Sequence, residues 1–137
     1  ESLFQGSKIF SDQGPNEDIY EKPSIDAKKD ERIKRSDLKE FSFFGEIFSL
    51  DFDFYSWLYF IALNQNKKLK TEILNYEAFT DIEFNPEKSL NCQAYSAALY
   101  SSMVKNKILV NDKEYDIGEL KNLMPSKKIK NYQQKLI

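Results

Sequence analysis

Two acidic residues stand at alternate positions in one stretch of the chain, Asp81 and Glu83. The turn signal Asn85-Pro86 follows them, and Asn91 then marks the start of a helix. Acids on a short extended segment that leads into a helix N-terminus could hold a sugar and a phosphate side by side. The same pattern also fits an ordinary strand, an Asx turn at Asn85 and a core helix, so both interpretations stay open at this point.

The residue types limit which chemistry the chain can perform. The 137 residues include no histidine, which excludes Ser-His-Asp and Cys-His machinery and histidine-ligated zinc. The single cysteine, Cys92, excludes an intramolecular disulfide and a cysteine-based zinc site. Acid–base work must therefore use carboxylates, lysine, tyrosine or the one thiol, and we expect neither a metal nor another cofactor.

The composition is that of one globular domain, with aromatic residues frequent enough, at 15%, to build a large core. The formal net charge of −2 predicts weak overall attraction to nucleic acid, so any such contact needs a local patch. No apolar run approaches the ~20 residues that span a bilayer. We expect no membrane contact, and a lone cysteine fits a cytoplasmic protein.

The first ten residues allow two interpretations. Residues 3–6, Leu-Phe-Gln-Gly, resemble the scar of an engineered protease site. Alternatively, the apolar residues Leu3, Phe4 and Phe10 have near-helical spacing, and Glu1 and Lys8 would share one helix face at a separation of two turns.

The elements that must position these residues are mostly helices. Residues 11–23 form a loop, and Ser24 caps a helix that runs to about Arg35. Its basic residues Lys28, Lys29 and Arg32 form either a solvated face or a binding site. Two short strands are predicted around Gly45, within residues 41–50.

Residues 54–64 are apolar on nearly all sides, which predicts the central helix. Trp57 in this helix either packs in the core or contacts substrate. A more polar helix is expected over residues 67–75. The next helix begins at Ser89 or Asn91 and ends at about Lys105. Its predicted inner face consists of Ala94, Ala97, Ala98, Leu99 and Met103.

The last part of the chain carries weaker signals. Residues 108–110 and 114–117 suggest a hairpin, and residues 118–124 a short helix. The tail from Ser126 is basic, which fits either a frayed end or a contact with nucleic acid.

Four blocks in this order resemble a known family. They are Glu-Ser-x-Phe-Gln-Gly-Ser-Lys-x-Phe at residues 1–10, Ala-Lys-Lys-Asp-Glu-Arg at 27–32, Phe-Tyr-x-Trp-Leu-Tyr at 54–59, and Ala-Phe-Thr-Asp-Ile-Glu-Phe-Asn-Pro-x-Lys-Ser-x-Asn-Cys-Gln-Ala at 78–94. The chain resembles the NADAR family, of YbiA-like fold, over about residues 1–105. It is most similar to the branch encoded beside DarT-type DNA ADP-ribosyltransferase toxins, whose members act as antitoxins. Residues 3–6 continue into the rest of this motif, which favours a native segment over a scar.

The resemblance implies an α+β, predominantly helical fold with small β pieces, and a single NADAR-like domain over residues 1–137. Residues 1–105 form its core and residues 106–137 an extension. Members of this branch carry a substantial segment before the Glu1 motif, so part of the fold is expected upstream. The implied activity is hydrolysis of the N-glycosidic bond between ADP-ribose and guanine in DNA. The implied partners are ADP-ribosylated DNA, expected to be single-stranded, ADP-ribose and the cognate toxin.

By motif, the family's essential Glu falls on Glu1, its lysine on Lys8 and its tryptophan on Trp57. The second acid falls on Asp81 or Glu83. The family pattern Asp-x-Trp-Gly is replaced here by Asp-Ile-Glu-Phe-Asn-Pro at residues 81–86, so both acids remain candidates.

Elementary chemistry agrees with this set. Carboxylates can stabilise positive charge at the anomeric carbon and protonate the base or activate water, and a desolvated lysine can form a Schiff base with ring-opened ribose. The diphosphate could rest at the helix start near Asn91, assisted by Lys88 or Arg32. Stacking on adenine or guanine is expected from Trp57, Phe4 or Phe84, beside Asn85. A non-catalytic module that binds ADP-ribose or toxin, and a hydrolase of small N-glycosides such as intermediates of riboflavin synthesis, are the alternatives.

Overall fold

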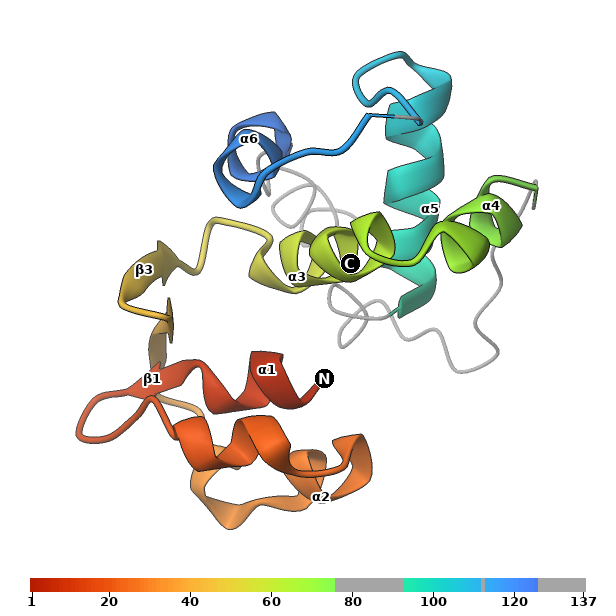
Figure 1. Ribbon diagram of the computed structural model, residues 1–137. Coiled ribbons are helices and arrows are strands. Elements are labelled where there is room, and N and C mark those ends of the chain that lie inside the picture. Colours follow the sequence, from red (N-terminus) through yellow and green to blue (C-terminus); the bar gives the residue numbers. More distant parts are fainter. Residues whose placement is uncertain (76–92, 112, 126–137) are drawn as a thin grey trace, which may run out of the picture. The chain divides into compact units, whose positions relative to one another are not determined.

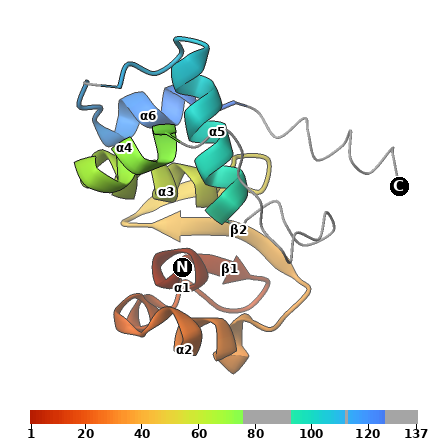
Figure 2. The ribbon, with the colours of Figure 1, turned by 90° about the vertical axis from the view of Figure 1, so that its right-hand side faces the viewer.

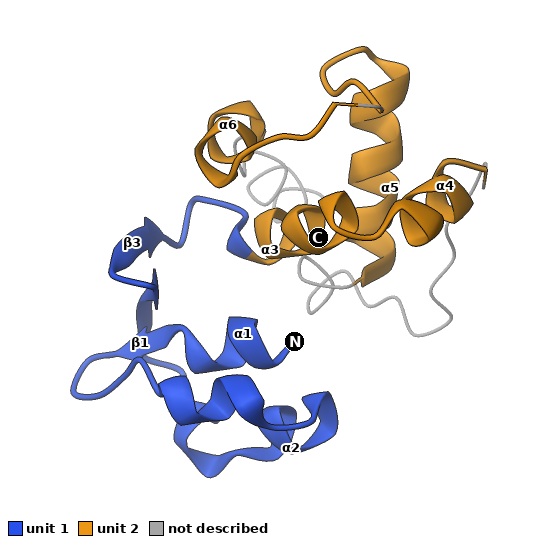
Figure 3. Ribbon diagram, in the orientation of Figure 1, with its two compact units in different colours: residues 1–54 blue, residues 55–137 orange. Residues whose placement is uncertain are grey.

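A computed structural model describes residues 1–75, 93–111 and 113–125. The chain divides into two compact units, residues 1–54 and residues 55–137, which Figure 3 shows in different colours. The positions of the parts relative to one another are not determined, so each unit is described by itself.

The first unit combines short helices with a small sheet, and Figure 1 shows its elements from red to yellow. In chain order these are α1 (Ser2–Gly6), β1 (Lys8–Phe10), the 3-10 helix η1 (Glu17–Glu21), α2 (Ser24–Lys29), the 3-10 helix η2 (Glu31–Ile33), β2 (Leu38–Phe43) and β3 (Glu46–Ser49). The strands form an antiparallel sheet in the order β1-β2-β3. Lys8 pairs with Phe41 in this sheet, and Phe43 pairs with Glu46. The predicted pair of strands around Gly45 is confirmed.

The β2–β3 hairpin turns through two residues with positive φ, Phe44 at 48° and Gly45 at 81°. This is the backbone pattern of a type I′ turn, whose twist matches that of the flanking strands. Gly45 adopts it without strain, whereas the left-handed conformation costs a residue other than glycine about 1 kcal/mol. Phe44 therefore occupies a position that local preference would give to Asn or Asp.

The helix predicted over residues 24–35 is shorter than expected. Helix α2 ends at Lys29, and Asp30 is extended, with φ −60° and ψ 125°. The Asp30 carboxylate accepts a hydrogen bond from the backbone N–H of Arg32 at 3.0 Å, so Asp30 caps η2 instead of continuing α2. Ser24 does not cap either, because Pro23 occupies the N-cap position without a side-chain hydrogen bond. Within the predicted loop, residues 17–21 form η1.

Two groups of buried side chains hold the first unit together. One consists of Phe10, Ile19, Ala27 and Ile33, with Leu38 against it. The other is aromatic, and Phe41 lies 5.2 Å from Phe4 and 4.8 Å from Phe54 between ring centroids. These contacts fix α1, which lies next to α2 (Figure 2), relative to the sheet.

The second unit is helical in the part that the structure describes. Its helices are α3 (Phe54–Asn64, whose first residue belongs to the first unit), α4 (Lys67–Asn75), α5 (Gln93–Lys105) and α6 (Ile117–Leu123). The predicted helices over residues 54–64 and 67–75 are confirmed at both ends, and the short helix near residue 118 is confirmed as α6. The predicted start of α5 at Ser89 or Asn91 lies outside the described residues.

The buried face of α5 is rotated from the predicted one. Ala97 and Met103 are buried as expected, but Ala98 is exposed, and Ser96 and Tyr100 are buried instead. The hydroxyls of Ser56 and Ser96 are hydrogen-bonded at 2.8 Å, and Tyr100 packs edge-on against Phe60. A buried polar pair and a large aromatic thus replace the small apolar stripe that periodicity favours.

The predicted hairpin over residues 108–117 is wrong, because the described residues of this segment contain no strand. After α5 the chain turns at Lys107, whose φ is 61°, and the N–H groups of Ile108 and Leu109 both donate to the carbonyl of Met103. Asp116 then caps α6 by accepting from the Glu119 N–H at 2.8 Å.

No helix in the described residues has the length and apolar character required to cross a membrane. Helices predominate over strands in these residues, so the prediction of a mostly helical α+β structure is confirmed.

Candidate active site

Helix α1 presents the first acidic candidate. Glu1 occupies the N-cap position of this helix, and Gln5 follows one turn later on the same side. The side-chain Nε2 of Gln5 donates to Oε1 of Glu1 at 2.8 Å. Glu1 is half-buried, and this bond holds its carboxylate against Gln5.

Lys8 lies close to this carboxylate although it is no longer in the helix. Its Nζ is 5.1 Å from the centroid of the Phe4 ring. Burial lowers the pKa of the Lys8 ammonium from its ordinary value of 10.5, and the negative charge of Glu1 opposes that shift. The structure therefore brings Glu1, Phe4 and Lys8 together. The predicted two-turn helix face does not exist, because α1 ends at Gly6 and the chain passes through Ser7 into β1, which carries Lys8.

Gly6 and Ser7 fix this passage from α1 into β1 by packing against Tyr20. A Cβ atom at Gly6 would lie 2.5 Å from the ring of Tyr20, so only glycine allows this close approach. The buried hydroxyl of Ser7 is hydrogen-bonded to the Tyr20 hydroxyl at 3.0 Å, and the Ser7 carbonyl accepts from the Ser42 N–H at 2.8 Å. Tyr20 and β2 thereby position the segment that carries Lys8.

Gln5 contacts the candidate residue Glu1 and was not predicted from the sequence. Its side chain is 8% exposed, and its Oε1 is buried without a hydrogen-bond partner. A buried, unpaired amide oxygen is uncommon in folded proteins and needs an explanation. The available signal was the i, i+4 spacing between Glu1 and Gln5.

Phe4 is packed inside the first unit. It is 6% exposed, and its ring contacts Phe41, Phe54 and the Lys8 ammonium. In this conformation Phe4 supports Lys8 and presents no open face to a base.

Arg32, predicted to assist at the diphosphate, is held by two carboxylates. Its Nη2 donates to Asp18 at 2.7 Å and to Asp30 at 2.8 Å. Hydrogen bonds from Arg32 and Lys22 hold the pKa of Asp30 well below its usual range. A diphosphate would have to displace these carboxylates, so the role of Arg32 stays a prediction.

Trp57 belongs to the second unit and is 1% exposed. Its indole N–H donates to the backbone carbonyl of Ile117 at 3.2 Å. This agrees with the core-packing interpretation, and stacking on a base stays a prediction.

The remaining predicted residues lie outside the described residues. They are Asp81, Glu83, Phe84, Asn85, Lys88 and Asn91. Among the residues that are described, none form a cluster of three or more histidine, cysteine, aspartate or glutamate side chains suited to a metal ion.

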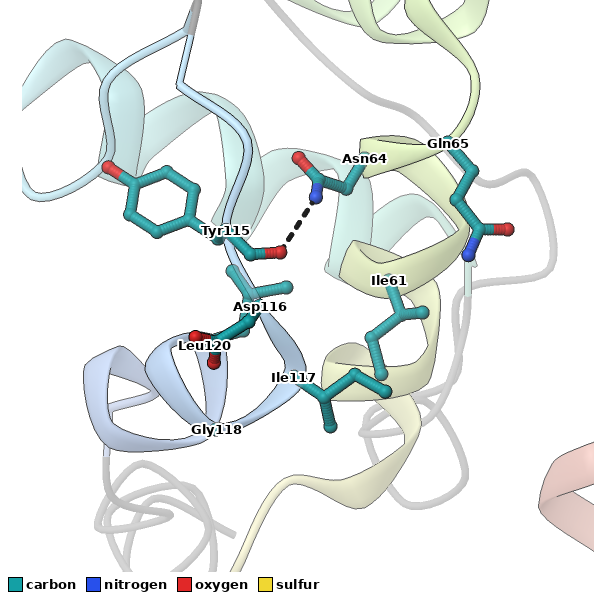
Figure 4. Close-up of a pocket in the computed structure, with 8 residues that line it drawn as sticks. All are labelled: Ile61, Asn64, Gln65, Tyr115, Asp116, Ile117, Gly118 and Leu120. Carbon is teal, nitrogen blue, oxygen red and sulfur yellow. Dashed lines mark hydrogen bonds between the residues drawn. The ribbon is translucent and has the colours of Figure 1, made fainter.

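A cavity of about 420 Å³ in the second unit contains none of the predicted site residues. Figure 4 shows the side chains around it, including the hydrogen bond from Asn64 Nδ2 to the Tyr115 carbonyl at 3.0 Å. Its lining comes from the end of α3 and from residues 115–120, namely Ile61, Asn64, Gln65, Tyr115, Asp116, Ile117, Gly118 and Leu120. The titratable groups brought together around Glu1 make the first unit the better candidate for chemistry.

The comparison with protein families agrees with the motifs in the sequence. A family model described as the DarT1-associated NADAR antitoxin matches residues 1–134. No curated protein matches the chain. The match includes the residues around Glu1 and Lys8 and confirms the resemblance seen in the sequence. The chain therefore belongs to the family of DarT1-associated NADAR antitoxins.

Proposed function

We propose that this protein is a hydrolase that cleaves the N-glycosidic bond between ADP-ribose and guanine in DNA, and that it acts in the cytoplasm as antitoxin to a DarT-type toxin. Membership of the antitoxin family supports the antitoxin role. The observation that carries the chemical part is that Glu1, held by Gln5, acts electrostatically on a partly buried Lys8 on the same short segment.

Glu1 is the acid that we place nearest the reacting bond. Cleavage of a ribosyl N-glycosidic bond builds positive charge at the anomeric carbon, and a nearby carboxylate stabilises this charge. The hydrogen bond from Gln5 orients the Glu1 carboxylate before substrate arrives. A carboxylate fixed in this way needs little rearrangement during the reaction.

Lys8 is the proposed amine nucleophile. Burial favours its neutral form, because the charged ammonium loses hydration. In the ring-opened form of the substrate, C1 is joined to the guanine nitrogen as an iminium. A neutral amine can add to this C1, and its proton passes to the guanine nitrogen as the C1–N bond to guanine breaks. Water then hydrolyses the resulting Schiff base to ADP-ribose and the free amine. The negative charge of Glu1 opposes this lowering of the Lys8 pKa.

The rest of the proposed site follows the family motif. Asp81 or Glu83 supplies the second acid, which protonates the base or activates water. Asn91 with Lys88 holds the diphosphate, and Phe84 beside Asn85 stacks on a base. Trp57 and Arg32 can contact substrate only if Trp57 leaves the Ile117 carbonyl and Arg32 leaves the carboxylates of Asp18 and Asp30.

The test is release of ADP-ribose from guanine-ADP-ribosylated single-stranded DNA, followed by borohydride reduction during turnover. We expect release by the unaltered chain and a reduced adduct on Lys8, detected by mass spectrometry of peptides. Lys8→Arg keeps the charge and should lose the adduct, whereas the matched control Lys28→Arg, at an exposed lysine of α2, should keep it. Release without any adduct would rule out the Schiff-base route and leave the acids as the catalysts.

The two alternatives predict different results in the same experiment. A binding module would retain tight binding of ADP-ribose or toxin in calorimetry while releasing nothing from DNA. A hydrolase of small N-glycosides would show competition by the small substrate against the DNA substrate. Absence of release from modified DNA would contradict the proposed function.

A further inference from the structure

The tip of the β2–β3 hairpin carries an aromatic ring in solvent. Phe44 is 75% exposed, and its φ of 48° is in the left-handed region. Asn, Asp or Gly is the usual residue at this position of a type I′ turn, and a bulky residue there is an outlier. Neither burial nor turn preference explains a phenylalanine at this place.

The ring of Phe44 is nevertheless held by neighbours. Phe43 lies edge-on to it at 4.5 Å between centroids, and Tyr20 lies at 6.1 Å from it. The Tyr20 hydroxyl in turn is hydrogen-bonded to Ser7, the residue before Lys8. The exposed ring is therefore supported by the same tyrosine that positions the candidate active site.

The sheet register fixes how far the tip lies from that site. Lys8 is opposite Phe41, and Phe44 follows three residues later along β2 and into the turn. At about 3.3 Å per residue this is about 10 Å along the strand. With the reacting ribose at Lys8, a nucleotide next to the modified guanine would lie within reach of the ring.

We propose that Phe44, supported by Phe43 and Tyr20, stacks on a nucleobase that flanks the modified guanine in single-stranded DNA. This inference rests on the proposed function and adds a contact with unmodified DNA to it. Stacking on an aromatic ring is tolerant of sequence, because every base offers a π-face. An uncharged aromatic ring has no group that would hold a phosphate, so the ring contacts a base and not the backbone.

The test compares two substrates with two variants at Phe44 and one control variant. Phe44→Asn suits the type I′ turn, so the hairpin should stay folded. We expect kcat/KM to fall about tenfold, or about 1.4 kcal/mol, with an ADP-ribosylated oligonucleotide and to stay unchanged with ADP-ribosylated guanosine. Phe44→Trp should retain activity on both substrates. The control Ile25→Asn, which removes another exposed apolar side chain, should affect neither. An equal effect of Phe44→Asn on both substrates, or no effect on the oligonucleotide, would overturn the proposal.

A binding measurement separates this inference from the proposed function. In the Phe44→Trp variant, unmodified single-stranded oligonucleotide should quench the new tryptophan, while the buried Trp57 in the unaltered chain gives the background. Quenching supports the stacking contact even if no substrate is hydrolysed. If the chain is active, absence of quenching at oligonucleotide concentrations that saturate its activity would overturn the stacking proposal. If the chain is inactive, absence of quenching up to millimolar oligonucleotide would overturn it.

Discussion

Replacing Gln5 by methionine tests whether this residue serves the site more than the fold. The change removes the hydrogen bond to Glu1, and a hydrogen bond to a charged group contributes about 1.5–3 kcal/mol. It also removes a buried oxygen without a partner, which costs about 1–3 kcal/mol while it is present. The two terms oppose each other, so we expect the free energy of unfolding to change by less than about 1 kcal/mol.

Gln13 provides a matched control in the same unit. Its Nε2 donates to the Arg32 carbonyl at 2.7 Å, and its Oε1 accepts from Asn16 at 3.0 Å. Because both ends of this amide are paired, Gln13→Met should lose about 2 kcal/mol of unfolding free energy. Urea unfolding of both variants measures the difference. Equal losses in the two variants would refute the assignment of an unpaired oxygen to Gln5.

The activity of the Gln5→Met variant then tests its role. Without the Nε2 donor, Glu1 loses its fixed orientation, and misplacement of a catalytic group can lower the rate about ten- to hundredfold. We expect kcat for release of ADP-ribose to fall in that range, with little change in KM. A rate equal to that of the unaltered protein would show that Gln5 does not orient the carboxylate.

Three further changes test the packing and charge of the first unit. Asp30→Asn should lower the unfolding free energy at pH 7 by about 2 kcal/mol, because the side chain is 7% exposed and pairs with Arg32. The pKa of Asp30 lies below its ordinary value of 3.8, so its contribution to the free energy of unfolding is present above pH 3.8 and is lost as the pH falls below that value. The free energy of unfolding should therefore fall less steeply with acid in the variant. Gly6→Ala should destabilise by about 1–3 kcal/mol in urea unfolding, because its Cβ would overlap the Tyr20 ring. Lys8→Met should be at least as stable as the unaltered protein at pH 7, because burial of the charged Lys8 ammonium destabilises the folded state. Since the pKa of Lys8 is lowered in the folded state, the unfolded chain binds more protons just below pH 10.5. In that window the unaltered protein, but not the variant, should gain stability as the pH rises. A stable Asp30→Asn variant, an unaffected Gly6→Ala variant or a clearly weakened Lys8→Met variant would each contradict the packing described.

Helix α1 shows what the sequence could and could not predict. The helical spacing of its apolar residues indicated a helix, and the structure has one over Ser2–Gly6. The proximity of Glu1 and Lys8 was predicted for the wrong reason, since Lys8 lies in β1 and not on the helix, and the passage from α1 into β1 is packed against Tyr20. Contacts between residues 14 positions apart leave no periodic signal in the chain.

The long apolar helix was the easiest element to predict. Residues 54–64 carry one continuous pattern, and helix α3 matches it at both ends. The short segment around residues 108–117 failed, because a few apolar residues near a turn signal fit a strand and a loop equally well. There the left-handed Lys107 and the cap at Asp116 determine the path.

The candidate site was predicted in part. The motif identified Glu1 and Lys8, which the structure brings together, whereas the helix pattern could not show that Asp30 would engage Arg32. Trp57 illustrates why residue type alone does not separate substrate contact from packing. A tryptophan packed in a core and a tryptophan stacked on a base both bury the apolar ring, so either role fits the residue type. In the structure the Trp57 ring is buried, and its N–H donates to a backbone carbonyl.

The most direct test of the central claim is single-turnover release of ADP-ribose from a guanine-ADP-ribosylated oligonucleotide by the unaltered chain, by Glu1→Gln and by Lys8→Met. The account predicts release by the unaltered chain and at least a hundredfold slower release by each variant, with both variants folded by circular dichroism. Release at an unchanged rate by both folded variants would show that the reaction takes place elsewhere and would contradict the account.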